Sequence, residues 1–536
     1  MTDKARRHAP SRLPRRKVLA AGAVAPLIAA AAGRAKPAAA PLAMTVHGPV
    51  RGYRDGAINV FKGVRYGADT RPRRFERPAR PQGWQEPVEA VDYGPACPQR
   101  GAREAISEDC LFLNVWTPGL ADGGKRPVMV YFHGGAYNSG SGSSPLYDGR
   151  RLAEKGDVVV ITVNHRLNAF GYLYLPLVAG GALPDSGNAG MWDLVLALEW
   201  VRDNAATFGG DPGRVMVFGQ SGGGAKIATL MAAPAAMGFF HAAATMSGQQ
   251  VTASGPLNAS ERARAFLDAL SVSPGDVAAL KSLPAERLVE ALATPDPIGP
   301  DRGGVYFGPV LDERFLSRHP FWPDAPAQSA EIPMILGNTK DETRNLIGAR
   351  EPDAFDLRWE DLPARLAAHM RVDIHPGHVV ETYRRLYPDH SPSDVFFAAT
   401  TAARSWRGQV EESDARARQG APTWVYQMDL ASPLDGGKWG APHTIDIAHA
   451  FDNTDKPGSL TGTGAAARRV ADELSRAFIA LARHGDPNHS GLPRWDRHTL
   501  PERQTMVFDE TTRLMNDPRK GERALFAKVP FTQWGT

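Results

Sequence analysis

A serine set among small residues is the first sign of chemistry in this chain of 536 residues. The segment Phe218-Gly219-Gln220-Ser221-Gly222-Gly223 contains a G-x-S-x-G pattern and follows apolar residues at 215–218. Small neighbours permit a sharp turn from strand to helix that exposes the serine hydroxyl at the helix N-terminus. Ser221 is therefore predicted to be a nucleophile, although the pattern alone also fits an ordinary glycine-rich loop.

A neutral serine is a poor nucleophile, so it needs a base, a group that orients the base, and N–H donors for the developing oxyanion. The segment His133-Gly134-Gly135-Ala136-Tyr137 directly follows the apolar run 127–132. Its consecutive small residues let backbone N–H groups converge on one point. We predict an oxyanion hole formed by the N–H groups of Gly135, Ala136 and Gly222, with a simple glycine turn as the alternative.

Both motifs must be positioned by regular elements. Apolar runs at 127–132, 158–163, 215–218 and 332–336 are typical of buried strands, and a helical stretch at 191–207 lies between them. This alternation predicts a large, mostly parallel sheet with helices on both faces.

Further motifs make the chain resemble the type-B carboxylesterases, the α/β-hydrolase branch that includes cholinesterase-like proteins. The resemblance covers most of residues 44–536 and is carried by these segments: Phe61-Lys62-Gly63-Val64-Arg65-Tyr66-Gly67, Ser107-Glu108-Asp109-Cys110-Leu111-Phe112-Leu113-Asn114-Val115-Trp116, Val163-Asn164-His165-Arg166-Leu167, and the block from Gly187-Asn188-Ala189-Gly190 to Gly224. It implies an α/β-hydrolase fold in a single domain, 44–536. Regions 250–330 and 345–420 are expected to form cap-like helical excursions over the active site.

The resemblance also implies the remaining triad members, in the chain order serine, acid, histidine. Glu342, in Gly337-Asn338-Thr339-Lys340-Asp341-Glu342, is similar to the family's acid, and Asp341 is the competing carboxylate, expected instead in a turn or cap. His443, in Gly440-Ala441-Pro442-His443-Thr444-Ile445-Asp446, is similar to the family's base. Three residues are expected around the triad: Gln220, Ser247 and Asp446.

Other histidines and two tryptophans receive structural interpretations. His449 is predicted to be a packed or pocket-edge residue, and His133 and His165 to support the motif backbones. Trp192 and Trp406 are expected in core packing, with a place in the acyl site as the alternative.

The resemblance implies a serine hydrolase that cleaves small-molecule carboxylic esters through an acyl-enzyme, with no cofactor and no metal. The sequence shows no clustered His or Cys ligand set. Two alternatives stay open: an amide or carbamate hydrolase with the same triad, and a non-catalytic cholinesterase-like binding protein. The intact triad disfavours the second, and the natural substrate and oligomeric state are left open.

Three departures from the family pattern bear on the substrate. Gln220 stands where cholinesterase-like members commonly carry Glu, and Ala136 stands where a third Gly is common. Cys97 and Cys110 are separated by 12 residues, too few for the loop that contacts choline, so choline esters are disfavoured. The two cysteines are nevertheless where the family has its first disulfide, which an oxidising compartment would permit, with reduced buried thiols as the alternative.

The N-terminus resembles an export signal. Arg15-Arg16-Lys17-Val18-Leu19 opens an apolar run, and Ala38-Ala39-Ala40 provides an A-x-A site, so residues 1–40 are predicted to be a twin-arginine signal for a periplasmic or secreted protein. A disordered basic tail is the alternative. The apolar run is too short to span a membrane stably. Residues 1–40 carry a net charge of +8, which leaves −4 for the rest of the chain, so nucleic-acid binding has no support.

Overall fold

The structure is a computed structural model that describes residues 39–299, 303–533 and 535. Almost all of the predicted export signal, 1–40, lies outside these residues. Residues from Ala40 to Thr536 form one compact unit. None of the helices in the described part of the chain has the length and apolar character needed to cross a membrane.

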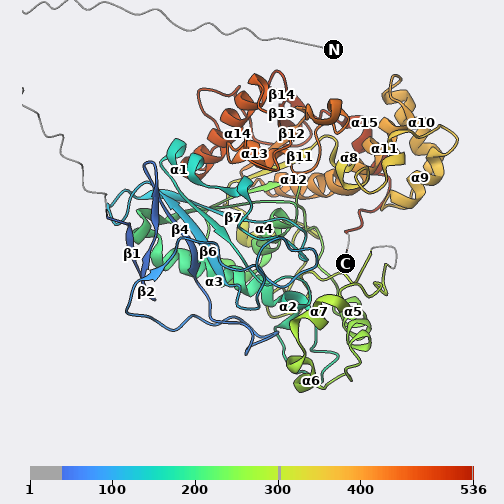
Figure 1. Cartoon of the computed structure of the whole chain (residues 1–536). Coiled ribbons are helices and arrows are strands. Elements are labelled where there is room, and N and C mark those ends of the chain that lie inside the picture. Colours follow the sequence, from blue (N-terminus) through green and yellow to red (C-terminus); the bar gives the residue numbers. More distant parts are fainter. Residues whose placement is uncertain (1–38, 300–302, 534, 536) are drawn as a thin grey trace, which may run out of the picture. The chain divides into compact units, whose positions relative to one another are not determined.

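The fold is built on a sheet of eleven strands in the order β14-β13-β12-β11-β10-β9-β7-β8-β6-β4-β3. Neighbouring strands from β13 to β8 are parallel, and the pairs at both edges are antiparallel. The α/β-hydrolase prediction of a large, mostly parallel sheet is confirmed (Figure 1). The strands of this sheet are β3 (Tyr53–Asp55), β4 (Ile58–Arg65), β6 (Phe112–Thr117), β7 (Arg126–Phe132), β8 (Val159–Val163), β9 (Gly210–Gln220), β10 (Ala242–Met246), β11 (Met334–Thr339), β12 (Thr423–Met428), β13 (Gln504–Phe508) and β14 (Arg513–Asn516). A small second sheet holds β1 (Leu42–Thr45), β2 (Gly48–Arg51) and β5 (Val88–Glu89).

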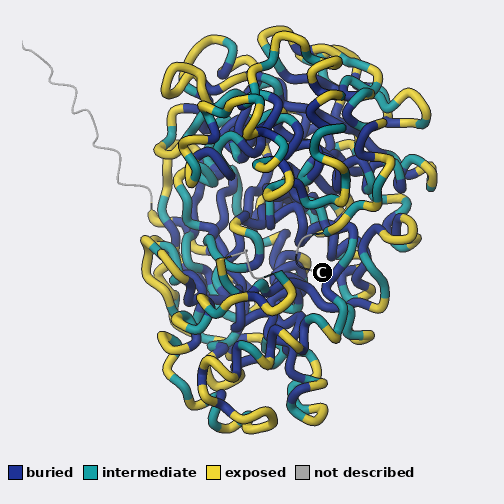
Figure 2. The backbone as a smooth tube through the Cα atoms, turned by 90° about the vertical axis from the view of Figure 1, so that its right-hand side faces the viewer, coloured by how far each residue is buried: buried dark blue, intermediate teal, exposed yellow. Residues whose placement is uncertain are grey.

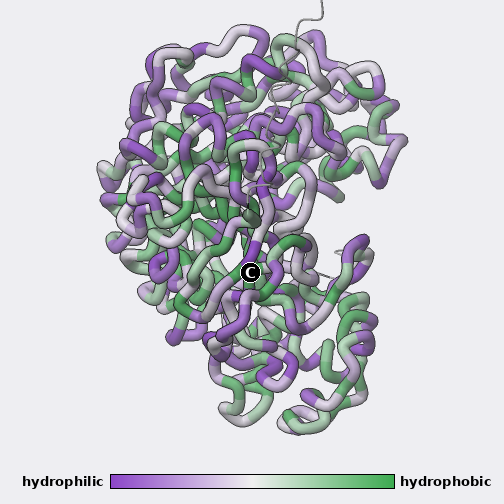
Figure 3. The backbone as a smooth tube through the Cα atoms, turned by 60° about the vertical axis from the view of Figure 1, so that its left-hand side comes forward, coloured by the Kyte–Doolittle hydropathy of each residue, from purple (hydrophilic) through white to green (hydrophobic). Residues whose placement is uncertain are grey.

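Helices cover both faces of the large sheet because its central strands are apolar on both sides. Along β7, Val128 and Val130 belong to one hydrophobic core, whereas Met129 and Tyr131 belong to the other. Helices α3 (Ala189–Asn204) and α4 (Gly222–Ala232) pack on the first face, and α1 (Arg150–Gly156), α13 (Ile445–Ala450) and α14 (Ala465–His484) pack on the second. Figure 2 shows the buried backbone through the middle of the fold and exposed backbone in the outer loops, many of which are hydrophilic in Figure 3.

The predicted ranges differ from the observed elements mainly at their ends. The run at 215–218 is part of the longer β9, and α3 ends at Asn204, where the chain tightens into a 3-10 turn over Ala205–Phe208. Strand β11 begins at Met334 instead of 332, because Pro333 has no N–H to give to the sheet ladder.

Most of the described residues in the region 250–330 lie outside helices, whereas the region 345–420 is largely helical. The first carries α5 (Pro256–Ala269), α6 (Val277–Ser282) and α7 (Ala285–Ala291). The second carries α9 (Leu362–His369), α10 (Pro376–Leu386), α11 (Pro392–Thr401), a π-helical turn (Ala402–Trp406) and α12 (Arg407–Gln419). The described residues also form the short α-helices α2 (Asn168–Tyr172), α8 (Glu342–Leu346) and α15 (Lys520–Phe526).

The disulfide expected between Cys97 and Cys110 is absent from the structure, in which both residues are free and buried. The hydrogen bond with Cys97, together with burial, holds the pKa of the Cys110 thiol well above its usual value. Disulfide formation proceeds through a thiolate, so this environment disfavours the reactive form. The Sγ of Cys97 also accepts a hydrogen bond from the N–H of Leu167, at 3.2 Å.

Candidate active site

The predicted nucleophile lies on a sharp turn between β9 and α4. Ser221 has φ 55° and ψ −124°, a backbone conformation that L residues rarely adopt but that a nucleophile elbow requires. Its N–H donates to the carbonyl of Met246, at the end of neighbouring β10, at 2.7 Å. A side chain on Gly223 would overlap the carbonyl oxygen of Phe132, the last residue of β7. Glycine at 223 therefore lets the elbow lie directly against the loop that follows β7.

That loop contains the predicted oxyanion donors, and its backbone is tightly bent. Gly135 and Ala136 have φ values of 87° and 53°. A side chain on Gly222 would overlap the backbone of Ala136, so the two segments are in close contact. The N–H of Gly222 belongs to the first turn of α4, where helical geometry supplies no partner. Gly135, Ala136 and Gly222 line the same cavity as Ser221.

The predicted acid and base are in direct contact. His443 Nδ1 lies 2.5 Å from Glu342 Oε2, and both side chains are buried. Burial alone would raise the pKa of Glu342, but the His443 ring and hydrogen bonds from Ser247 and Asn338 lower it below its usual value. The carboxylate is therefore ionised and holds the imidazole.

This contact assigns the histidine tautomer. Because the ionised Glu342 can only accept, Nδ1 of a neutral His443 carries the proton and Nε2 is an acceptor. Nε2 lies 3.1 Å from the amide nitrogen of Gln220, the residue before the serine. Ser221 and His443 line one cavity. The acceptor nitrogen of the ring therefore lies beside Gln220, and the histidine and the serine line the same cavity.

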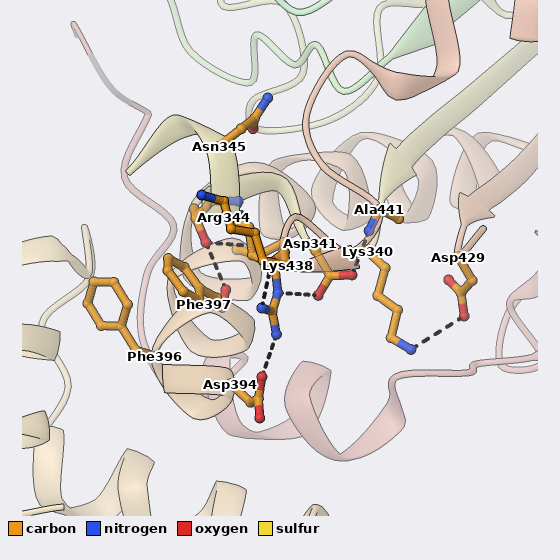
Figure 4. Close-up of polar contacts among 12 residues, drawn as sticks. Lys340, Asp341, Arg344, Asn345, Asp394, Phe396, Phe397, Asp429, Lys438 and Ala441 are labelled. Carbon is orange, nitrogen blue, oxygen red and sulfur yellow. Dashed lines mark hydrogen bonds and ion pairs between the residues drawn. The ribbon is translucent and has the colours of Figure 1, made fainter. Parts of the chain in front are cut away.

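Asp341, the competing carboxylate, has a different partner. Its Oδ2 accepts a hydrogen bond from the N–H of Ala441 at 2.9 Å, two residues before the histidine. The guanidinium of Arg344 lies 3.5 Å from its other oxygen and donates to the carbonyl of Lys438 at 3.0 Å (Figure 4). The structure thus brings Glu342 to the histidine ring and Asp341 to the backbone of the loop that carries it.

The comparisons with known proteins show the family of the chain. The model of the carboxylesterase family matches residues 39–526. The chain belongs to the carboxylesterase family. It is 31% identical over 499 residues to the para-nitrobenzyl esterase of Bacillus subtilis, and the alignment covers 89% of this chain and 97% of the esterase. It is 33% identical over 508 residues to the phenmedipham hydrolase of Pseudarthrobacter oxydans, and this alignment covers 89% of this chain and 97% of the hydrolase.

A solved structure supports the fold as well. A carboxylesterase from Geobacillus stearothermophilus superposes with a TM-score of 0.81 at 35% identity, over 90% of this chain and 99% of that one. Family membership and fold together identify the chain as a carboxylic ester hydrolase.

Two of the three residues expected around the triad of this carboxylesterase have defined contacts with it. Gln220 reaches His443, and Ser247 hydrogen-bonds to Glu342 and lowers its pKa. Asp446 instead accepts a hydrogen bond from the hydroxyl of Tyr426 at 2.7 Å, and burial raises its pKa to about 6. Asp446 therefore links the start of α13 to Tyr426 on β12.

Three supporting residues were not found from the sequence. Asn338 donates to Glu342 Oε1 at 2.9 Å. The side chain of Asn345 binds the backbone of His443 twice: its Oδ1 accepts from the His443 N–H at 3.1 Å, and its Nδ2 donates to the His443 carbonyl at 2.8 Å. Asn345 lies one turn after Glu342 on α8, a spacing that could have suggested a shared role.

Lys226 is the third. Its Nζ donates to the carbonyl oxygens of His133 and Ala136 at 3.1 and 2.8 Å, so α4 holds the oxyanion loop in place. Burial lowers the pKa of Lys226 to about 7. A lysine in a glycine- and alanine-rich helix gives no sequence signal of this function.

His133, His165, His449, Trp192 and Trp406 lie in packed surroundings. His133 and His165 stack with ring centroids 4.7 Å apart, and burial lowers the pKa of His133 to about 3. His449 is buried, and its pKa is likewise lowered to about 3. Trp192 packs edge-on against Phe315, and the guanidinium of Arg519 lies over the ring of Trp406. Neither tryptophan is among the described residues that line the cavity with Ser221.

The cavity that contains Ser221 has a volume of about 590 Å³, enough for a small or medium-sized ester. Its walls come from both helical excursions and from the C-terminal segment Phe531, Thr532 and Gln533. No group of three or more His, Cys, Asp or Glu side chains among the described residues is placed to hold a metal ion.

Proposed function

We propose that the chain hydrolyses carboxylic esters through an acyl-enzyme on Ser221, with His443 as general base and Glu342 as the orienting acid. The contact between His443 Nδ1 and Glu342 carries this proposal. It leaves Nε2 as the acceptor in a cavity lined by Ser221 and by the predicted oxyanion donors.

In acylation, His443 Nε2 takes the hydroxyl proton while Ser221 Oγ attacks the ester carbonyl. The N–H groups of Gly135, Ala136 and Gly222 stabilise the tetrahedral oxyanion, and Glu342 stabilises the imidazolium. The imidazolium then returns its proton to the departing alkoxide, so that the alcohol leaves and the acyl group stays on Ser221.

In the structure, the side-chain amide nitrogen of Gln220 lies within hydrogen-bonding distance of His443 Nε2. Catalytic hydrogen bonds in ligand-free enzymes are often long and tighten when substrate binds. We infer that Nε2 exchanges its contact with the Gln220 amide for one with Ser221 during attack.

In deacylation, His443 takes a proton from water, which attacks the acyl carbon. The same N–H groups hold the second oxyanion. Collapse releases the carboxylic acid as Ser221 regains its proton from the imidazolium. The cycle is balanced by one water consumed for each ester cleaved.

The test compares wild type with Ser221→Ala on 4-nitrophenyl butyrate. We expect the variant to lose at least about 10³ in kcat, because the covalent route is removed. An aryl organophosphate should inactivate the wild type and label the peptide containing Ser221. Equal rates for the two proteins, or a label on another peptide, would contradict the proposed nucleophile.

Amide or carbamate cleavage would use the same residues with a poorer leaving group. Matched 4-nitroanilides, assayed beside the esters, separate the two activities. We expect ester hydrolysis to exceed anilide hydrolysis by at least about 10²-fold in kcat/KM, and the opposite preference would reassign the substrate class.

We also propose that the chain is exported through the twin-arginine route, which the Arg15-Arg16 pair and the Ala38-Ala39-Ala40 site support. The mass of the protein recovered outside the cytoplasm should correspond to a chain starting near residue 41. Replacement of both arginines by lysine should keep the full-length chain inside, whereas unchanged export would refute this route.

A further inference from the structure

Three arginine residues line the cavity that contains Ser221 and His443. They are Arg350, Arg371 and Arg404. The three come from separate segments: Arg350 follows α8, Arg371 follows α9, and Arg404 lies in the π-helical turn Ala402–Trp406. π-Helical turns are rare and are often found at functional sites, because they change the direction of the side chains they carry.

The described residues that line this cavity include no Asp or Glu. The neutral polar lining residues are Asn138, Ser139, Gln249, Gln250, Thr444 and Gln533, among others. Gln220 contributes an amide where cholinesterase-like proteins commonly have a carboxylate. The excess of positive charge is local, because the chain beyond residue 40 has a formal net charge of −4.

The charge of Arg404 persists at neutral pH. Burial, opposed by Glu342 and assisted by neighbouring Arg350, lowers the pKa of Arg404 to about 10. A guanidinium with this pKa stays protonated during ester hydrolysis. Glu342 itself is fully buried and bonded to His443, so it does not face the cavity.

We propose that this cavity selects esters that carry a free carboxylate, which Arg350, Arg371 and Arg404 bind while the ester carbonyl lies at Ser221. The inference rests on the proposed function and adds the substrate class. Guanidinium groups present paired donors that match a carboxylate, and such charge-assisted bonds are stronger in a partly enclosed cavity than in water.

The experiment uses two matched ester pairs, since the carboxylate could belong to either half of the substrate. The mono-4-nitrophenyl ester of adipic acid is compared with 4-nitrophenyl hexanoate, and 4-acetoxybenzoate with 4-acetoxybenzamide. We expect wild type to favour the anionic member of at least one pair by about tenfold or more in kcat/KM, the scale of one charge-assisted hydrogen bond.

Substitutions test the assignment of this preference to the arginines. Arg404→Gln and Arg350→Gln should each lower the ratio of anionic to neutral kcat/KM by about tenfold, and Arg404→Lys should retain part of it. Arg358→Gln removes an exposed arginine that does not line the cavity, and should leave the ratio within about twofold. Because Arg350 is exposed, its variant provides the test if Arg404→Gln fails to fold.

Failure of this inference is distinguishable from failure of the proposed function. If wild type hydrolyses the neutral esters through Ser221 and disfavours both anionic ones, the arginine site is refuted and the esterase stands. If no ester is cleaved, calorimetry of adipate with the Ser221→Ala protein decides. If the Ser221→Ala protein binds adipate and the Ser221→Ala/Arg404→Gln protein binds it at least tenfold more weakly, the anion site is supported. If the Ser221→Ala protein does not bind adipate, the anion site is overturned.

Discussion

At the scale of single residues, a buried carboxyl group supports the wall of the active-site cavity. Glu412, on α12, accepts a hydrogen bond from the N–H of Gln250 at 2.7 Å, and Gln250 lines the cavity. Burial raises the pKa of Glu412 to about 8, although the Gln250 hydrogen bond and Arg416 oppose the shift. Glu412 is therefore largely protonated in the folded protein at neutral pH.

This shift predicts a pH dependence of stability. An unfolded Glu has a pKa of about 4.3, so between this value and about 8 the folded chain binds more protons than the unfolded chain. The stabilising contribution is therefore complete below about pH 4 and is lost as pH rises through about 8. Glu412→Gln should raise Tm by at least about 2 °C at pH 9 and change it little at pH 5.

Thermal unfolding monitored by circular dichroism checks this prediction. Glu411→Gln is the matched control, because the adjacent Glu411 is partly exposed and paired with Arg407. The difference in Tm between Glu411→Gln and wild type should not grow toward pH 9. If the Tm of wild type and that of Glu412→Gln change with pH in parallel, Glu412 ionises normally in the folded protein.

At the scale of elements, the base is placed by a connection between α8 and the loop 440–444. Asp341 binds the N–H of Ala441, and Asn345 binds the backbone of His443 on both sides. Gly440 has φ 58°, and a side chain there would overlap the Asp341 carboxylate. The helix that begins with the acid therefore also fixes the position of the base.

We expect Asp341→Ala to lower kcat by about tenfold, because it leaves a buried N–H unpaired and loosens the histidine loop. Glu342→Gln should lower kcat by at least about 10³, since the tautomer and the imidazolium lose their partner. Asp394→Ala removes the α11 partner of Arg344 and the Asp394 contacts to Ser391 in the α11 capping box, but it preserves the Ala441 bond, so its effect on kcat should be smaller. Steady-state kinetics on one ester ranks the three, and a larger loss in Asp341→Ala than in Glu342→Gln would reverse the assignment of the acid.

Local patterns were sufficient to predict the elbow and the oxyanion loop. An apolar strand followed by small residues encodes a tight turn within about ten positions, so Ser221, Gly222 and Gly135 could be found directly. The choice between Asp341 and Glu342 rested on resemblance, because the two are adjacent and only their three-dimensional partners separate them.

Other features depend on contacts that no local pattern encodes. Lys226 becomes a support of the oxyanion loop only because α4 packs beside β7. The arginines of the cavity come from three separate segments, and the π-helical turn that carries one of them has no clear sequence signature. Cys97 and Cys110 are likewise buried and free, which their spacing does not reveal.

At the scale of the whole molecule, one sheet links all parts of the site. Ser221, Ser247 and Glu342 follow β9, β10 and β11, which are adjacent and parallel, and the His443 loop follows β12. Carboxyl ends of parallel strands meet at one edge of a sheet, so residues more than two hundred positions apart converge. The two main cores of the described residues begin at Ala43 and Ile58.

Removal of residues 1–39 should therefore leave stability and activity almost unchanged. The unit Ala40–Thr536 is compact by itself, and we expect its Tm within about 2 °C of the full chain, with kcat/KM within about twofold. Calorimetry and ester kinetics on the two proteins provide the check. A loss of several degrees in the shortened protein would show that the first 39 residues stabilise the hydrolase unit.

The two cysteines, both at most 1% exposed, are the only ones in the sequence. A maleimide fluorophore would consequently find no accessible native thiol, and a single introduced cysteine would become a unique attachment point. Thr532, exposed at the cavity wall, is suited to this use as Thr532→Cys. Emission from that position would report occupancy of the pocket in real time, without cysteine removal and without any chromogenic product.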